Sequence, residues 1–305
     1  MSGKKNILVS VVGPTAVGKT KFAIALAQHF DTEIVSADSR QFYKEMHIGT
    51  AKPDAGELAE AKHHFVNSHS IEEHYSVGMY EKDAISLLDE LFQEHDVVIA
   101  VGGSGLFFKA IWDGFDEMPE VDLALRAQLN AEFEASGIEP LLNELKAHDP
   151  VYFEEVDKAN HQRVIRALEV IRTSGKPFSY FRKGQKKTIR NFMNVKIGLE
   201  MERSVLFARI NERMDVMIGA GLFEEAKELE KYRDHNALQT VGYSEIFGYF
   251  NGEYDREEAV RLLKRNSRRY AKRQMTWFKK DQEVNWIQPN DFPQAIRLIK
   301  ESLDT

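Results

Sequence analysis

The sequence contains 305 residues, of which 43% are hydrophobic and none is cysteine, and its formal net charge is −7. The lack of cysteine excludes disulfides, thiolate nucleophiles and cysteine-ligated zinc, and no apolar run approaches the length of a membrane span. We expect a cytoplasmic protein without membrane association, built from one large domain or from a core with a smaller companion.

A buried strand is predicted over residues 7–12, and it runs directly into a glycine-rich loop. The loop sequence GPTAVGKT matches the phosphate-binding pattern G-x-x-x-x-G-K-[ST], and a helix with one apolar stripe is predicted to follow from residue 22. Backbone N–H groups of such a loop turn toward an anion, and the helix N-terminus adds its positive dipole end. Lys19 would supply a mobile positive charge, and Thr20 a hydroxyl for a phosphate-bound Mg²⁺. The predicted polyphosphate-binding residues are Gly13, Pro14, Thr15, Ala16, Val17, Gly18, Lys19 and Thr20.

A second short strand is predicted over residues 33–37 and ends at Asp38. In open α/β sheets the ligand crevice lies outside the carboxyl ends of the strands, so we expect Asp38 to face the bound phosphates. A carboxylate at this position could accept a proton from a nucleophile, coordinate Mg²⁺ or cap a helix. The local sequence leaves these three roles open.

A third strand is possible at residues 65–66, a helix is predicted from residue 80 to 92, and a fully apolar strand is predicted over residues 96–101. The apolar strand is followed by Gly102-Gly103-Ser104-Gly105, which offers backbone N–H groups and one hydroxyl but no carboxylate. ATPases usually carry an acidic metal ligand at this place. The sequence therefore argues mildly against plain ATP hydrolysis, although the phosphate loop itself is common to many kinases.

Beyond this strand the pattern is purely helical from about residue 121 to 173, and one more strand is predicted over residues 195–199 before further helices. Strands that alternate with helices indicate a parallel sheet with right-handed crossovers. We therefore predict an α/β fold, a P-loop NTPase-like parallel sheet flanked by helices, with an all-helical insertion. The catalytic core would comprise residues 1–118 and 190–305, and the insertion residues 119–189.

Positive charge is concentrated near the C-terminus despite the acidic overall balance. Residues 261–280 include nine Lys or Arg and no acidic residue. One helical face carries Arg261, Arg265, Arg268 or Arg269, and Lys272. A weaker basic group spans residues 176–190. Such clusters indicate phosphate-binding surfaces, and the alternative is an ordinary solvated helix face.

Seven segments together resemble the P-loop isoprenyltransferases, in particular their tRNA-modifying branch, the tRNA dimethylallyltransferases. The most specific are SADSRQFYKEMHIGTAKP at 36–53 and YAKRQMTWF at 270–278, beside the phosphate loop. The others are VGGSGLFFKA at 101–110, HQRVIRALEV at 161–170, RINERMD at 209–215 and TVGYSE at 240–245. These segments span nearly the whole chain. The adenylate isopentenyltransferases share the phosphate loop, but the basic helix and the insertion fit the tRNA-modifying branch better.

The resemblance implies transfer of a dimethylallyl group from dimethylallyl diphosphate to the exocyclic N6 amine of adenosine 37, beside the anticodon of tRNA, with release of diphosphate. In that reaction Thr15, Lys19 and Mg²⁺ on Thr20 would neutralise the leaving group. Asp38 would accept the proton of the attacking amine, and Arg213 would contact the diphosphate. From the local pattern alone, Arg213 would be an ordinary surface arginine.

The resemblance also assigns contacts with the tRNA anticodon stem-loop. The family usually has Thr at position 104 and often Cys at position 240, where this chain has Ser and Thr. Neither change removes a group that the chemistry needs. The implied tRNA-binding residues are Asp38, Ser39, Arg40, Gln41, Ser104, Arg126, Gln162, Arg163, Val164, Ile165, Arg166, Thr240, Val241, Gly242 and Tyr243.

Some roles stay open. Phe107 and Phe108 could line a pocket for the prenyl tail or pack in the core, and the tryptophans at 112, 277 and 286 could be structural or stack on bases. Three functions remain in competition: a tRNA prenyltransferase acting as a monomer, a P-loop kinase or NTPase acting on a small molecule, and an RNA-binding protein with a nucleotide switch.

Overall fold

The computed structural model describes residues 5–120, 122–182 and 189–304, which form two compact units. The first unit comprises Met1–Trp112 and Arg190–Thr305, and the second comprises Asp113–Ile189. The second unit thus begins at Asp113, whereas the sequence suggested residue 119. The reason lies in Trp112, the last residue of helix α4 (Gly105–Trp112). Its buried indole N–H donates to Ser10 Oγ at 2.9 Å and ties the helix end to the core.

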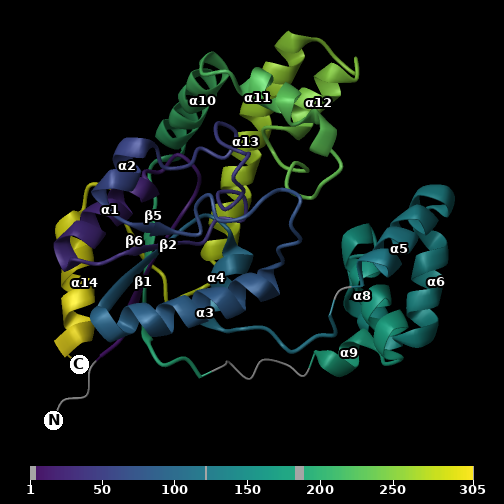
Figure 1. Ribbon diagram of the computed structural model, residues 1–305, viewed down its shortest axis with the longest axis horizontal. Helices are drawn as coiled ribbons and strands as arrows, with labels where there is room; N and C mark the ends of the chain where they lie inside the picture. Colours follow the sequence, from purple (N-terminus) through teal and green to yellow (C-terminus); the bar gives the residue numbers. More distant parts are fainter. Residues whose placement is uncertain (1–4, 121, 183–188, 305) are drawn as a thin grey trace. The chain divides into compact units, whose positions relative to one another are not determined.

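A six-stranded parallel sheet forms the centre of the first unit, which confirms the predicted α/β class (Figure 1). Its strand order is β3-β2-β4-β1-β5-β6. The strands are β1 (Ile7–Val12), β2 (Ile34–Ser36), β3 (His63–His64), β4 (Val97–Val101), β5 (Met193–Leu199) and β6 (Asn285–Ile287).

Two details of the sheet differ from the sequence-based expectation. The third strand lies at His63–His64 rather than at residues 65–66, because Phe65 has a φ of 59° and the chain turns away there. The short strand β6 was not predicted. It has only three residues, and its pairing with β5 rather than any alternation of its own defines it.

Helices cover both faces of the sheet. Successive side chains of β1 point to opposite faces, and the apolar side chains on each face are covered by helices. Ile7, Val9 and Val11 pack with helices α1 (Lys19–Phe30) and α14 (Phe292–Asp304). Leu8 and Val12 pack with α3 (Val77–Glu94) and α4 (Gly105–Trp112). The remaining helices of this unit are α2 (Ala55–Glu60), α10 (Arg203–Gly219), α11 (Leu222–Glu228), the 3₁₀ turn Glu230–Tyr232, α12 (Ser244–Phe250) and α13 (Arg256–Phe278).

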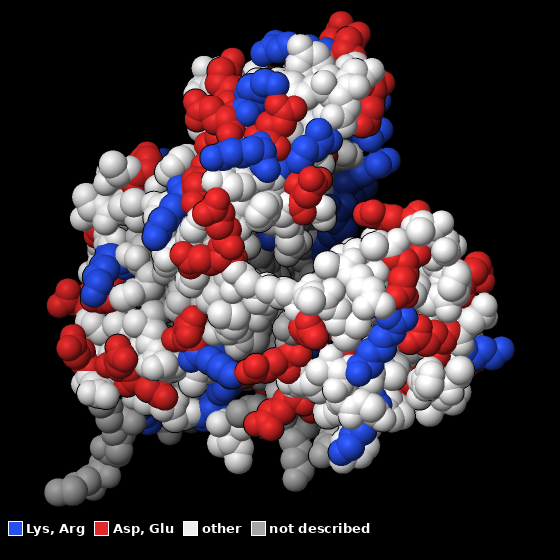
Figure 2. All heavy atoms as spheres, turned by 45° about the vertical axis from the view of Figure 1, so that its right-hand side comes forward, with Lys and Arg blue, Asp and Glu red and all other residues white. Residues whose placement is uncertain are grey.

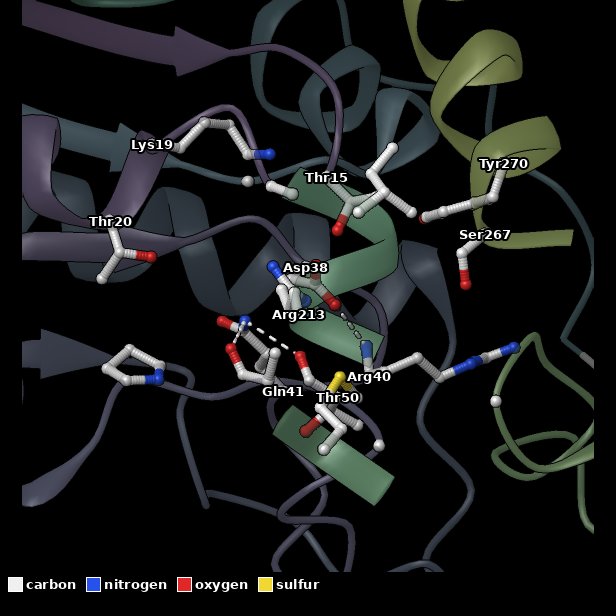
Figure 3. Close-up of a pocket in the computed structure, with 18 of the residues that line it drawn as sticks. Thr15, Lys19, Thr20, Asp38, Arg40, Gln41, Thr50, Arg213, Ser267 and Tyr270 are labelled. Atoms are coloured by element: carbon white, nitrogen blue, oxygen red, sulfur yellow. Dashed lines mark hydrogen bonds between the residues drawn. The ribbon is translucent and has the colours of Figure 1, made fainter. Parts of the chain in front are cut away.

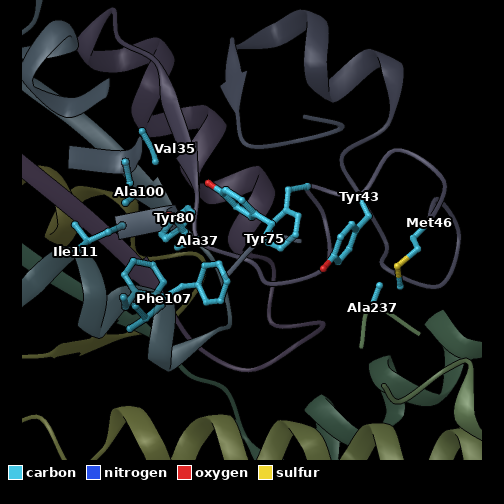
Figure 4. Packing of buried hydrophobic residues seen from close by; sticks show 14 of the residues in the cluster. Val35, Ala37, Tyr43, Met46, Tyr75, Tyr80, Ala100, Phe107, Ile111 and Ala237 are labelled. Carbon is cyan, nitrogen blue, oxygen red and sulfur yellow. The ribbon is translucent and has the colours of Figure 1, made fainter. Parts of the chain in front are cut away.

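The cluster beside α3 and α4 contains Phe107 and Phe108, so both phenylalanines pack in the core (Figure 4). Phe107 stacks on Phe42 and tilts against Tyr80, with ring centroids 6.0 and 4.6 Å apart. Tyr80 is fully buried, and its hydroxyl donates to the Ser36 carbonyl at 3.0 Å. This packing fixes the end of β2, from which Asp38 follows.

The second unit is helical throughout its described part, as predicted. Leu129, Leu141, Leu145, Ile165 and Leu168 form the centre of its own small core. Its helices are α5 (Leu123–Ser136), α6 (Glu139–His148), α7 (Pro150–Glu155), α8 (His161–Ser174) and α9 (Phe178–Phe181). In neither unit does a described helix have the length and apolar character needed to cross a membrane.

Candidate active site

The first unit contains a pocket of about 860 Å³ at the carboxyl ends of β1, β2 and β4, the neighbouring central strands (Figure 3). This is where the crossover geometry of an open α/β sheet directs a ligand. Besides the phosphate loop, its lining includes five segments. They are the Asp38–Gln41 turn, the loop Gly49–Ala51, α10 from Arg209 to Met217, the segment Thr240–Gly242, and Ser267, Tyr270 and Gln274 of α13.

The phosphate loop takes its shape from two glycines with positive φ, Gly13 at 144° and Gly18 at 108°. A Cβ at Gly13 would lie 2.6 Å from the carbonyl oxygen of Leu199, so no other residue fits there. Gly18 precedes α1 and no side chain caps that helix, which leaves its first N–H groups to an anion. The Lys19 Nζ donates to the carbonyls of Gly13 at 3.0 Å and Pro14 at 2.8 Å.

Three charged side chains meet in this pocket. Burial lowers the pKa of the Lys19 ammonium to about 7, with Arg213 acting in the same direction and Asp38 opposing it. Burial also lowers the pKa of Arg213, again opposed by Asp38. Asp38 and Arg213 lie side by side in the hollow below the loop (Figure 3). Two basic side chains and one carboxylate in the same pocket suit a ligand with a separate anionic end.

Asp38 caps a turn rather than a helix. One of its oxygens accepts from the Arg40 N–H at 2.9 Å, and the next helix begins at Ala55 with Asp54 as its cap. The helix-cap role is therefore wrong. The two chemical roles, proton acceptor and metal ligand, remain.

Other predicted residues gather beside Asp38. Ser104 Oγ accepts from the Ser39 N–H at 2.9 Å and donates to Ser39 Oγ at 3.2 Å, so the glycine turn after β4 supports the turn after β2. The Gln41 amide donates to the carbonyls of Thr50 and Ala51 at 3.4 and 3.3 Å. Arg40 and Gln41 line the pocket together with Thr50 (Figure 3).

Thr240, Val241 and Gly242 line the pocket, but Tyr243 does not. Its side chain is fully buried, and its hydroxyl donates to Glu225 at 2.6 Å. Glu225 also accepts from the N–H groups of the loop at residues 47–49, at 2.7–2.9 Å. Tyr243 thus ties two walls of the pocket together, and its side chain has no surface for RNA.

The remaining predicted residues lie in the helical unit. Glu169 is buried there and accepts from Arg126 at 3.1 Å and Arg166 at 2.9 Å, while Arg126 also donates to Gln162 at 3.3 Å. Gln162 and Arg163 are exposed. Val164 and Ile165 are fully buried in the core of this unit, so their side chains do not present a contact surface.

Gln274 is a pocket residue to which the sequence analysis gave no role. It is buried on α13, its oxygen accepts from the Thr15 N–H at 2.8 Å, and its nitrogen donates to the Gly103 carbonyl at 3.0 Å. One carboxamide thus joins the phosphate loop to the turn after β4. The available signal was an uncharged amide within the basic YAKRQMTWF segment, at helical spacing from Tyr270 and Ser267.

Several cations of α13, the helix that carries the basic run at residues 261–280, have partners within the protein and so are less available to RNA than the sequence suggested. Within the described chain, Arg261 pairs with Glu258, Lys264 with Asp215, and Arg268 donates to Asn211 at 2.6 Å. Acidic and basic side chains are mixed across the face shown in Figure 2. Among the described residues, the exposed cations of α13 without such partners are Arg269, Lys272 and Arg273, together with Arg256 at the start of the helix, which lies over the Phe223 ring.

The structure describes only part of the second basic group, at residues 176–190, so its role as a phosphate-binding surface stays a prediction. Lys183, Lys186 and Lys187 lie outside the described residues. Lys176 lies over the Tyr180 ring. Arg190 donates to the carbonyls of Ala110 and Ile111 and pairs with Glu81, so it serves the core.

Comparison with known proteins decides the family. A profile described as IPP transferase matches residues 41–281. The chain belongs to the IPP transferase family. A tRNA dimethylallyltransferase of Cytophaga hutchinsonii is 52% identical over 99% of both chains, and one of Christiangramia forsetii is 53% identical over 93% of both chains.

Solved structures of the family share the fold. A tRNA isopentenylpyrophosphate transferase from Bacillus halodurans is 38% identical, has a TM-score of 0.70, and covers 98% of this chain and 96% of its own. A eukaryotic dimethylallyltransferase acting on tRNA is 24% identical, has a TM-score of 0.79, and covers 98% of this chain and 78% of its own. The latter similarity concerns the fold alone.

Proposed function

We propose that this chain transfers the dimethylallyl group of dimethylallyl diphosphate to the N6 amine of adenosine 37 in tRNA. The observation that carries the proposal is the meeting of Lys19, Arg213 and Asp38 in one pocket, two cations for a leaving diphosphate and one carboxylate for an attacking amine. The relatives named tRNA dimethylallyltransferase support the same reaction.

The reaction breaks the bond between carbon 1 of the dimethylallyl group and the diphosphate oxygen, and it forms a bond from that carbon to N6. Negative charge grows on the diphosphate as the bond breaks, and Lys19, Arg213 and the loop N–H groups face that charge. The amine becomes cationic as it attacks, so its proton must leave, and we assign it to Asp38. The products are N6-dimethylallyl adenosine and diphosphate.

The residues present suit Mg²⁺ carried by the diphosphate. The described residues contain no cluster of three or more His, Asp or Glu side chains that could hold a metal. Mg²⁺ usually keeps several waters and binds through substrate phosphates with one or two protein oxygens. Thr20 lines the pocket at the start of α1 and offers such a hydroxyl. When bound, Mg²⁺ would add positive charge beside the leaving group.

The pocket also offers an apolar surface against which the dimethylallyl group could pack. Ile210, Met214 and Met217 of α10 line it on the same helix as Arg213. Methionine side chains adapt to irregular apolar groups. We therefore place the dimethylallyl group against these residues rather than against Phe107 and Phe108.

Adenosine would enter beside Asp38, Arg40, Gln41 and the Thr240–Gly242 segment, all of which line the pocket. A base in a folded stem-loop must leave its stack to reach such a site. Ser39 and Ser104 would support the turn from outside the pocket lining. In the helical unit, the exposed Gln162 and Arg163 are the candidates for direct contact with the anticodon stem-loop, with Arg126 and Arg166 beside them. We expect a monomer acting in the cytoplasm, where tRNA is available.

The test is incubation of the protein with dimethylallyl diphosphate or with ATP, each with and without tRNA and with AMP as a second acceptor. We expect diphosphate release and prenylated tRNA only with dimethylallyl diphosphate and tRNA together. Prenylation of AMP would instead indicate an adenylate isopentenyltransferase. Hydrolysis or transfer from ATP without prenylation would indicate a P-loop kinase or NTPase.

A further inference from the structure

One tryptophan differs from the other two in its exposure. Trp112 is 8% exposed and bonded to Ser10, and Trp286 is partly buried against the core. Trp277 of α13 is 44% exposed, and Leu106 at the start of α4 is 46% exposed. Of the three tryptophans, Trp277 has the most exposed ring, and an aromatic ring with one polar edge can stack on a partner.

The indole of Trp277 packs against the backbone of Gly105, and this contact is called the seat of the ring. A Cβ at Gly105 would lie 2.1 Å from both Cδ1 and Nε1 of Trp277, so the ring lies against the backbone of that glycine. The pyrrole part of the indole is covered there, while Trp277 as a whole remains 44% exposed. Gly105 follows Ser104, which supports the Asp38–Gln41 turn through Ser39. The seat is therefore adjacent to the turn that carries Asp38.

Exposed cations continue from this ring along the same helical face. Arg269, Arg273 and Trp277 are spaced four residues apart, and all three are exposed. No described acidic side chain pairs with either arginine, in contrast to Arg261 and Lys264 of the same helix. The Arg273 guanidinium lies 5.6 Å from the ring centroid of Tyr270, which lines the pocket. The stripe thus runs past the pocket rim.

We propose that Trp277 is a stacking platform for an unpaired RNA base neighbouring the base in the pocket, with Arg269 and Arg273 facing the phosphates of that strand. This inference rests on the proposed function and adds a binding residue to it. An aromatic ring stacks on any base, and adjacent cations attract the backbone. Exposed arginines with no acidic partner among the described residues favour a polyanionic strand over an apolar protein partner.

The experiment uses the full-length protein and a synthetic anticodon stem-loop RNA that contains the target adenosine. Trp277→Ala should raise the KM for RNA about tenfold, as expected for loss of one base–aromatic stack, and leave the KM for dimethylallyl diphosphate unchanged. Trp277→Phe, which keeps a ring, should recover most of the affinity. Trp286→Phe is the matched control and should behave like the wild type.

Tryptophan fluorescence provides a readout independent of catalysis. Binding of the stem-loop should quench the emission of the wild type and of Trp286→Phe, and the quenching should largely disappear in Trp277→Phe. Gly105→Ala displaces the ring from its seat and should reproduce the effect of Trp277→Ala on RNA binding. Thermal unfolding of each variant shows whether it is folded.

A folded Trp277→Ala protein with the RNA affinity of the wild type, or full quenching in Trp277→Phe, would overturn this inference. Both results leave the proposed function intact if the wild type still prenylates the stem-loop. Absence of prenylation by the wild type would refute the proposed function instead. In that case, loss of RNA binding in Trp277→Ala would still support the stacking site.

Discussion

The carboxamide oxygen of Gln274 accepts a hydrogen bond from the Thr15 N–H at 2.8 Å, across more than 250 positions of sequence. The phosphate loop therefore takes part of its shape from α13, the helix that also carries the exposed arginines. The second bond of Gln274, to the Gly103 carbonyl, is one that only a donor can make. This requirement distinguishes glutamine from glutamate.

Gln274→Met keeps the length of the side chain and removes both hydrogen bonds. We expect the free energy of unfolding to fall by about 1–3 kcal/mol for each buried polar group left unpaired, and the KM for dimethylallyl diphosphate to rise. Gln274→Glu should retain the bond to Thr15 but place a carboxylate against the Gly103 carbonyl. Steady-state kinetics and urea unfolding of both variants test this, and unchanged kinetics in both would show that the loop holds its shape unaided.

Lys19→Ala should lower kcat by roughly 10²–10³, the effect of removing one preorganised charge from an oxyanion. The loss should appear in kcat because the diphosphate charge that Lys19 meets grows in the transition state. The measurement is initial-rate kinetics with saturating tRNA. Turnover near that of the wild type would rule out the leaving-group role of Lys19.

Binding of diphosphate at pH 8 should be accompanied by uptake of a proton from the solvent by Lys19. The pKa of Lys19 is lowered to about 7, so its amine is mostly neutral at pH 8, and a bound anion raises that pKa and draws a proton. At pH 6 the amine is already protonated, and the uptake should vanish. Titration calorimetry in buffers of different ionisation enthalpy measures the proton number.

The matched control for this uptake is Lys19→Arg, whose guanidinium stays protonated throughout. Subtracting its proton number removes the contribution of the ligand's own titration. Equal uptake by the wild type and by Lys19→Arg at pH 8 would contradict the assignment of the proton to Lys19.

Gly49 and Tyr243 form a tight contact between two walls of the pocket. A Cβ at Gly49 would lie 2.4 Å from the Tyr243 Cζ, although the φ of Gly49 is not positive and its backbone would accept alanine. Gly49→Ala should therefore destabilise the protein by about 1–3 kcal/mol through overpacking alone. In a Tyr243→Leu background the same substitution should cost much less. Denaturant unfolding measures the loss of unfolding free energy caused by Gly49→Ala in each background. An equal loss in both would refute overpacking against Tyr243 as its cause.

Much of the core was predictable because its signals are local. The phosphate loop, the apolar strands and the helix after Gly18 each carry a pattern within a few residues, and the structure confirms the parallel sheet that they imply. The strand β6 and the role of Gln274 depend on partners distant in sequence, on β5 and on Thr15 and Gly103. No local pattern could supply them.

The resemblance predicted tRNA-binding residues from their positions in matching segments. Their burial in the structure shows which of these side chains could contact RNA. Val164, Ile165 and Tyr243 belong to matching segments but lie in the core, where they support their neighbours. The basic helix illustrates the same limit, because Arg261 and Lys264 find partners on their own or an adjacent helix. A run of like charges in sequence thus overstated the exposed positive surface.

The central claim is that Asp38 accepts the amine proton while the phosphate loop holds the diphosphate. Single-turnover transfer to tRNA by Asp38→Asn, with dimethylallyl diphosphate affinity measured on the same protein, tests it most directly. We predict a rate lower by roughly 10²–10⁴ than that of the wild type, with little change in affinity for the diphosphate. A normal transfer rate combined with weakened diphosphate binding would contradict the claim and make Asp38 a metal or structural residue.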